Sequence, residues 1–180
     1  MKVSFSNFKI LFLLFLLFGC NSNNLITEDS KSHINAQNDK LEIAKMLDDF
    51  NLAAANSEYE KYFDFFSDDG KFIGTDATEN WDKKSFMKFS KPFFDKKKTW
   101  DFKSIQRNIY LSENGNIAWF DELLNTWMKI CRGSGVLVKE NNKWKLKQYV
   151  LSATVPNSQI QSVIKLKAAE EDSLINVLSK

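Results

Sequence analysis

The sequence has very few of the residues that carry histidine- or thiol-based chemistry. It contains one histidine, His33, and two cysteines, Cys20 and Cys131. His33 lies in a polar stretch near the N-terminus, so a Ser-His-Asp or Cys-His relay would have no base in the body of the chain. A metal site would have to consist of carboxylates alone, and the sequence has no aspartate-rich loop of the kind that binds calcium. We therefore expect neither a metal nor another cofactor.

The sequence also lacks an excess of charge of either sign. It has 25 Lys and Arg against 23 Asp and Glu, and Lys2 and Lys9 belong to the N-terminal segment. Without these two lysines the balance is 23 to 23. A nucleic-acid-binding surface normally needs a clear basic excess, so we expect no nucleic-acid partner.

The N-terminus carries one apolar run, Ile10–Phe18, after Lys2 and Lys9. Nine residues are too few to cross a bilayer as a helix, which needs about 20, but they are typical of a signal-peptide core. The run ends in Leu17-Phe18-Gly19-Cys20, which resembles the lipobox of bacterial lipoproteins, although Phe18 is bulkier than usual. The alternative is an ordinary secretory signal with an unrelated cysteine. We predict a lipoprotein signal peptide over residues 1–19.

The lipobox resemblance implies cleavage before Cys20 and lipid attachment to its sulfur. Several acyl chains anchor a protein stably where one does not. We expect a lipid-anchored protein of the cell envelope, more readily in the outer than the inner membrane, because Asn21 is not a retention aspartate. Residues 20–40 are polar and predict a flexible tether. Cys131 is then left without a disulfide partner and is interpreted as a core residue.

The chain from Leu41 predicts an α+β domain over residues 41–157. A helical period begins at Leu41, Ser57 to Glu60 reads as the capping box of a second helix containing residues 59–66, and Asp82 is expected to cap a third. Strands are predicted over 71–74, 100–111, 117–128, 130–139 and 144–152, with turns at Asn114-Gly115 and Asn141-Asn142. Three helices packed on a strongly curved antiparallel sheet would leave a conical cavity. Residues 158–180 predict a C-terminal amphipathic helix, packed on the domain or on a partner.

Four short strings in this order resemble the SnoaL-like branch of the nuclear-transport-factor-2-like superfamily. They are Gly74-Thr75-Asp76, Ala118 to Glu122, Arg132 to Leu137, and Trp144 with Gln148 to Ser152 and Pro156-Asn157. The resemblance implies a cystatin-like cone, often dimerised through its sheet. The family includes isomerases, dehydratases and members that only bind, so fold alone does not decide chemistry. Its steroid isomerases use a carboxylate base close to the position of Gly74, near Asp76.

Strand alternation suggests which side chains face the cavity. In the predicted last strand, Gln148 and Ser152 share a face with Trp144. The predicted pocket residues are Asp76, Trp100, Trp119, Asp121, Arg132, Ser134, Gln148 and Ser152. Asp121 is the leading candidate for a functional carboxylate, with Asp76 second. An Asp121–Arg132 ion pair without chemistry is the favoured alternative.

Three hypotheses of function follow. The first is a membrane-tethered domain that binds a small apolar or amphipathic ligand in its cone. The second is a lyase or isomerase that uses Asp121 or Asp76 on such a ligand, and we favour binding over catalysis. The third is an interaction module of the cell envelope. The family resemblance also implies a homodimer formed through the sheet.

Overall fold

The structure is a computed structural model that describes residues 28–180. It begins with helices α1 and α2. The predicted signal peptide and Cys20 lie outside the described residues. Helix α1 runs from Glu28 to Ala55 and α2 from Tyr59 to Asp64. Residues 28–40 are therefore helical, which corrects the tether predicted there. Asp39 explains part of this, because its carboxylate accepts hydrogen bonds from Lys139 Nζ at 2.5 Å and Trp144 Nε1 at 3.3 Å and so joins α1 to the sheet.

The predicted helix starts have different outcomes. Asp82 caps α3, Lys83–Asp95, by accepting a hydrogen bond from the Ser85 backbone N–H at 2.7 Å, as predicted. The capping box at Ser57 is wrong. Ser57 has a φ of 58°, and its hydroxyl lies 2.9 Å from the Thr99 hydroxyl instead of bonding to the start of α2.

Six strands form one sheet in the order β2-β1-β6-β5-β4-β3. The strands are β1 Phe66–Ile73, β2 Asn80–Asp82, β3 Lys103–Leu111, β4 Ile117–Thr126, β5 Lys129–Glu140 and β6 Lys143–Ala153. The α+β class and its curved sheet are confirmed. The sheet is not wholly antiparallel, however, because β1 pairs with β6 in parallel. The predicted second helix also ends too late, since Phe66 already belongs to β1.

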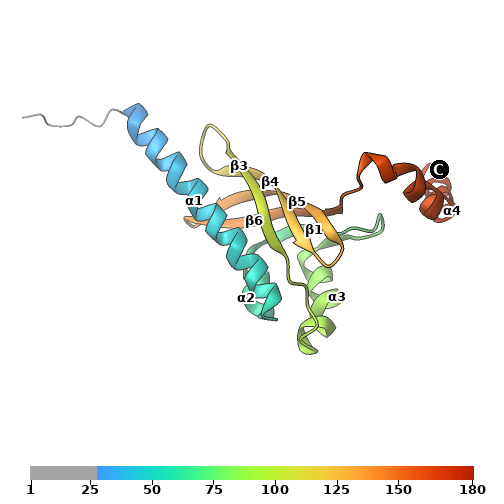
Figure 1. Cartoon of the computed structure of the whole chain (residues 1–180). Coiled ribbons are helices and arrows are strands. Elements are labelled where there is room, and N and C mark those ends of the chain that lie inside the picture. Colours follow the sequence, from blue (N-terminus) through green and yellow to red (C-terminus); the bar gives the residue numbers. More distant parts are fainter. Residues whose placement is uncertain (1–27) are drawn as a thin grey trace, which may run out of the picture.

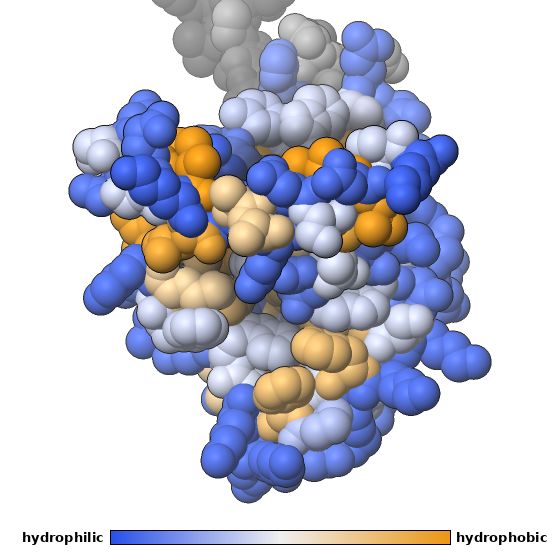
Figure 2. Space-filling model, turned by 90° about the vertical axis from the view of Figure 1, so that its right-hand side faces the viewer, coloured by the Kyte–Doolittle hydropathy of each residue, from blue (hydrophilic) through white to orange (hydrophobic). Residues whose placement is uncertain are grey.

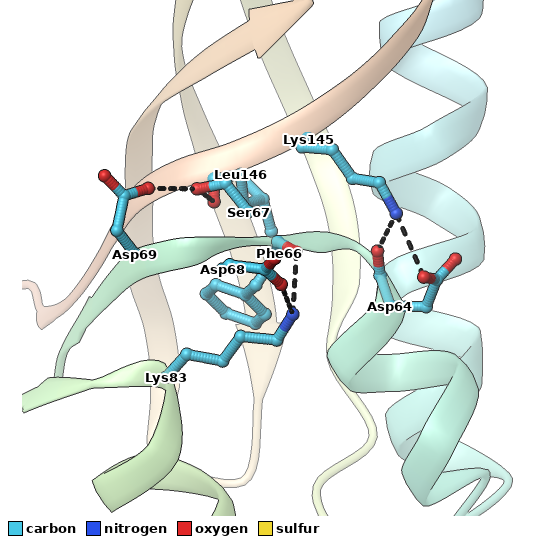
Figure 3. Close-up of polar contacts among 8 residues, drawn as sticks. All are labelled: Asp64, Phe66, Ser67, Asp68, Asp69, Lys83, Lys145 and Leu146. Carbon is cyan, nitrogen blue, oxygen red and sulfur yellow. Dashed lines mark hydrogen bonds and ion pairs between the residues drawn. The ribbon is translucent and has the colours of Figure 1, made fainter. Parts of the chain in front are cut away.

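The parallel pairing of β1 with β6 contains an irregular segment. Between the pairs Phe66–Leu146 and Lys71–Gln148, β1 advances five residues while β6 advances two. Side chains satisfy the backbone groups that this mismatch leaves unpaired (Figure 3). Ser67 Oγ donates to the Leu146 carbonyl at 3.2 Å, and Lys83 Nζ donates to the Phe66 carbonyl at 3.1 Å. Lys145, in turn, holds both the backbone carbonyl and the carboxylate of Asp64 at the end of α2.

A β-bulge in β6 reverses the faces predicted for that strand. The pairs Val136–Gln148 and Leu137–Leu146 leave Lys147 as an extra residue. Beyond the bulge, Tyr149 and Leu151 are the buried side chains, as Trp144 and Leu146 are before it. Gln148 and Ser152 therefore point to the opposite face from the one predicted, because one inserted residue shifts a two-residue period by half.

The concave face of the sheet is filled by aromatic side chains. Helix α1 contacts β3 and β6 and α3 contacts β1 and β2, so the helices cover one side of the sheet (Figure 1). Phe50 stacks on Tyr62 with ring centroids 4.5 Å apart and lies 5.4 Å from Tyr149. Phe66 and Phe86 are also buried in this cluster. The space between the helices and the sheet is thus filled by packed side chains.

The C-terminal helix α4, Ile160–Leu178, follows a short 3₁₀ turn, Asn157–Gln159. None of its residues is buried, and it lies to one side of the sheet in Figure 1. Figure 2 faces this side and shows separate apolar patches among hydrophilic side chains. The predicted helix is confirmed, but it does not pack tightly on its own domain. Within residues 28–180, no helix is apolar over a length sufficient to cross a membrane.

Candidate functional site

An apolar pocket of about 130 Å³ lies between β1, the loop that follows it, and α3. Seven of its lining residues are aromatic, from five separate segments of the chain: Phe72, Trp81, Phe86, Phe89, Trp100, Phe102 and Trp127. Gly74, Thr75, Glu79 and Leu151 complete the wall. Aromatic walls with few polar groups are typical of small-molecule sites. This pocket is the candidate functional site.

Contacts between the aromatic rings hold the pocket wall in place. Phe72 stacks on Phe86 with centroids 4.0 Å apart, and Trp81 stacks on Phe89 at 4.5 Å. Phe86 also lies parallel to Trp100 at 6.2 Å. Phe72 and Phe86 are buried, whereas Phe89 is 44% exposed. The pocket therefore has a rigid base in the core and a rim that solvent reaches.

Trp127 is the most exposed aromatic residue at the rim. It lies in the turn between β4 and β5, and 80% of its surface is exposed. A tryptophan normally buries much of its area on folding, and its exposure here leaves a large apolar surface beside a cavity. Trp127 is thus suited to cover a ligand that enters the pocket.

Glu79 is the only charged residue among those that line the pocket. Its backbone carbonyl accepts a hydrogen bond from the Gly74 N–H at 2.9 Å, and its Oε2 accepts one from the Asp76 N–H at 3.3 Å. A Cβ atom at position 74 would lie 2.1 Å from Glu79 Oε2. Glycine at position 74 is therefore needed for the carboxylate to occupy this place.

A second polar group, Glu122, lies inside the core on β4 and not at the pocket. Its side chain is fully buried, and its Oε2 lies 2.9 Å from Arg107 Nε and 2.8 Å from Arg107 Nη2. Tyr149 Oη donates to Oε1 at 3.3 Å. Burial raises the pKa of Tyr149 well above its usual value, and the negative charge of Glu122 raises it further. Tyr149 therefore remains a protonated donor, and Glu122 is engaged on both oxygens.

Arg107 connects this ion pair to α1. Its Nη1 donates to the Ala44 carbonyl at 2.9 Å and lies 2.9 Å from the exposed carboxylate of Asp48. Gly133 lies opposite Glu122 in the register of β4 and β5. A Cβ atom there would come within 2.5 Å of Tyr149 Oη, so glycine leaves room for the network. The cluster is arranged as a structural tie between helix and sheet.

The faces predicted for β4 and β5 are wrong. Ala118, Phe120, Glu122 and Leu124 of β4 are buried, as are Cys131 and Leu137 of β5. Trp119 and Asp121 therefore lie on the outer face of the sheet, with Ser134 and Arg132 of β5. The opposite faces of both strands are also apolar, which is why alternation alone could not choose between them. The inward carboxylate is Glu122, one residue from the prediction.

The predicted ion pair between Asp121 and Arg132 is replaced by a hydrogen bond from Asn108 to Asp121. In register, Asp121 faces Ser134 on one side and Asn108 on the other, and its Oδ1 accepts a hydrogen bond from Asn108 Nδ2 at 3.1 Å. Arg132 faces Leu123. Both side chains belong to the outer face, where they cannot act on a ligand in the core.

Asp76 lies in the exposed loop next to the pocket. Its Oδ1 accepts hydrogen bonds from the Thr78 hydroxyl at 2.5 Å and the Thr78 backbone N–H at 2.8 Å. These bonds lower the pKa of Asp76 below its usual value, the hydroxyl contributing most. A general base that works near neutral pH needs a raised pKa, so Asp76 is poorly suited to that role. Of the predicted pocket residues, only Trp100 lines the pocket.

A larger cleft of about 690 Å³ lies between α1 and the β3–β4 and β5–β6 turns. Its lining is mostly asparagine and other polar or charged side chains, including Asn35, Asn114 and Asn142. Such a wall offers little apolar surface to desolvate a ligand. Within the described range 28–180, no group of three His, Cys, Asp or Glu side chains is placed to hold a metal ion.

The sequence and the fold both have known counterparts. Residues 43–156 match the model of the family described as SnoaL-like domain. A search of curated proteins gave no significant match.

Solved structures resemble the fold at low sequence identity. A cystatin-like protein of unknown function from Nostoc punctiforme is 18% identical, covers 64% of this chain and 90% of its own, and has a TM-score of 0.54. An NTF2-like protein of unknown function from Pseudomonas putida is 12% identical, with coverage of 64% and 87% and a TM-score of 0.56. A proposed scytalone dehydratase from Novosphingobium aromaticivorans is 13% identical, with coverage of 68% and 89% and a TM-score of 0.57. At these identities the likeness shows the fold and not the activity.

Proposed function

The chain belongs to the SnoaL-like domain family, and on this premise we propose that it binds a small apolar group in the aromatic pocket without transforming it. The observation that carries the proposal is the pocket itself, where seven aromatic side chains surround about 130 Å³ of space. A cavity of about 150 Å³ lined by apolar side chains is large enough to bind benzene. The pocket therefore accepts one ring or a branched head group, and the rest of a ligand would lie along its rim.

Catalysis is less well supported than binding. Acid-base chemistry needs a group within reach of the substrate and free to exchange a proton. Glu122 is buried away from the pocket and paired with Arg107, and the pKa of Asp76 is lowered. Glu79 is the one carboxylate at the pocket, and no second ionisable side chain among the lining residues stands ready to act with it.

Tryptophan indole N–H signals test the pocket directly. In an NMR titration of the full chain with toluene, we expect the signals of Trp81, Trp100 and Trp127 to shift. Trp119, on the outer face of the sheet, is the internal control and should not move. Equal shifts at Trp119, or none at the three pocket residues, would refute the pocket as a binding site.

We also propose that the protein is held at the cell envelope by lipid on Cys20, with the outer membrane preferred. The lipobox resemblance of residues 17–20 supports this. In cells fed an alkyne analogue of palmitate, the chain should take up the label and sediment with outer-membrane vesicles. Cys20→Ala should abolish both properties, whereas Cys131→Ala, the matched control at the other cysteine, should keep both. Labelling that survives Cys20→Ala would exclude this anchor.

The outer face of the sheet supports a proposed homodimer. Tyr110 and Trp119 stack there at 5.8 Å, and Trp119 is 46% exposed. Asp121 and Arg132 share this face, so a two-fold axis between them would bring opposite charges together. Light scattering should give twice the mass of one chain for the wild type and the mass of a single chain for Trp119→Glu. A monomeric wild-type protein would contradict this arrangement.

Helix α4 favours a second candidate function, an interaction module. None of its residues is buried, and Leu166 is 85% exposed. Deleting residues 158–180 should abolish co-purification of an envelope partner while circular dichroism shows that the domain stays folded. Co-purification unchanged by the deletion would end this hypothesis.

A further inference from the structure

We propose that the aromatic pocket takes an organic cation, a protonated or methylated amine, with its positive group between the rings and the carboxylate of Glu79. This inference rests on the binding function proposed above and adds the charge of the ligand. It follows from three properties of the pocket: the chemistry of its walls, the position of its one carboxylate, and its size.

The walls favour a cation over a neutral ligand. The faces of aromatic rings carry negative electrostatic potential, and a cation within about 6 Å of a ring centroid is attracted to it. Trp81, Trp100 and Trp127 all line the pocket, and tryptophan gives the strongest attraction of this kind. Several rings around one small space are the arrangement by which proteins recognise quaternary ammonium groups.

Glu79 supplies a negative charge that forms no ion pair within the described residues. In residues 28–180, the ion pairs are made by other carboxylates. Its Oε2 is positioned by the Asp76 N–H and by the space over Gly74. A carboxylate in a partly apolar wall is costly to desolvate unless a positive group joins it.

The surroundings of the loop do not offset this charge. The loop from Gly74 to Glu79 contains two acidic residues and no basic one. Lys167, Glu170 and Glu171 of α4 lie on the other side of this loop, and Lys167 forms an ion pair with Glu171 at 2.6 Å. The local charge is negative, so a carboxylate or phosphate ligand would be repelled.

The size of the pocket limits what enters it. A volume of about 130 Å³ holds a trimethylammonium-sized group, in line with the cavity of about 150 Å³ that holds benzene. The remainder of a larger amine would leave past Phe89 and Trp127, whose exposed surfaces form the rim. The ligand class is therefore an amine with a compact head.

Choline and its neutral isostere 3,3-dimethylbutan-1-ol separate charge from shape. In titrations of the purified full chain followed by tryptophan fluorescence, choline should bind about tenfold more tightly than the isostere, because only its positive charge is attracted to the carboxylate of Glu79 and to the ring faces. Glu79→Gln should remove most of this preference and leave binding of the isostere unchanged. Glu113→Gln, the same substitution at an exposed hairpin, should have no effect.

The outcomes distinguish the two proposals. Equal affinity for both probes, with both weakened by Trp127→Ala, would overturn the cation inference and keep the pocket as an apolar site. A choline preference that persists in Glu79→Gln would overturn the role given to this carboxylate. Binding of neither probe, together with no response to toluene, would overturn the binding function itself.

Discussion

Breaking the buried ion pair of Glu122 and Arg107 should strongly destabilise the fold. Glu122 is fully buried, and 10% of the Arg107 side chain is exposed. Removing one member of such a pair leaves the other charged and desolvated, which costs about 3–5 kcal/mol. We expect Glu122→Leu and Arg107→Met each to lower the free energy of unfolding by this amount, a large part of the about 5–15 kcal/mol that holds a typical domain together.

The double variant tests the physical reason for this loss. Glu122→Leu combined with Arg107→Met removes both charges and keeps apolar volume, so it should lose less than either single variant. Asp48→Asn is the control at the exposed end of the network, where an ion pair contributes about 0–1 kcal/mol. The two single losses and the double loss together measure the coupling between the two side chains.

Urea unfolding followed by circular dichroism gives the required free energies, and equal slopes across the variants would show that the same surface unfolds in each. The reasoning would be refuted by single variants that lose less than about 1 kcal/mol, a value typical of a surface pair. Losses that simply add in the double variant would also refute it, because independent sites are additive and a buried pair is not.

Three further substitutions test other features of the fold. Gly133→Ala places a Cβ 2.5 Å from Tyr149 Oη, so it should lower the free energy of unfolding in urea by about 1–3 kcal/mol, as crowding of a packed core does. An unchanged urea midpoint would contradict this close approach. Phe86→Ala removes a ring from the base of the pocket and should cost about 3–5 kcal/mol, and a loss below 1 kcal/mol would mean that this core is loosely packed. Asp82→Ala should lower the melting temperature at pH 7, because the Ser85 N–H lowers the pKa of Asp82 in the folded state. Because the pKa of Asp82 is lower in the folded than in the unfolded protein, its charged form stabilises the fold at any pH above the ordinary pKa of 3.8. This stabilisation is lost as the pH falls through the folded pKa, so the melting temperatures of the wild type and of Asp82→Ala should converge in acid. A difference that stays constant with pH would contradict the cap.

Local patterns in the sequence predicted most of the secondary structure. The period of Ile43, Leu47 and Phe50 predicted the body of α1, and Asp82 predicted the start of α3. Asn141 and Asn142 predicted a turn, and both have positive φ angles of 49° and 60° in the β5–β6 connection. These features depend on residues close together in the chain, so the sequence states them directly.

Strand faces were the main failure, and two different reasons account for it. In β6, the extra residue Lys147 reverses the alternation, and no local feature of the sequence marks a bulge. In β4, Trp119, Asp121 and Leu123 compete with Phe120, Glu122 and Leu124, so both faces look equally apolar. Arg107 decides the question by approaching Glu122 from the neighbouring strand, a contact between residues 15 positions apart.

The sequence by itself determined the class of the fold, the order of its elements apart from β2, and the family, because each rests on composition, periodicity or short strings read along the chain. Only the tertiary structure decided which carboxylate is buried, which aromatic rings meet around one small space, and that Glu79 lies among them. The pocket draws its aromatic walls from five segments between Phe72 and Trp127. Its chemistry comes from side chains far apart in sequence, and their meeting depends on sheet register and curvature, which no local pattern specifies.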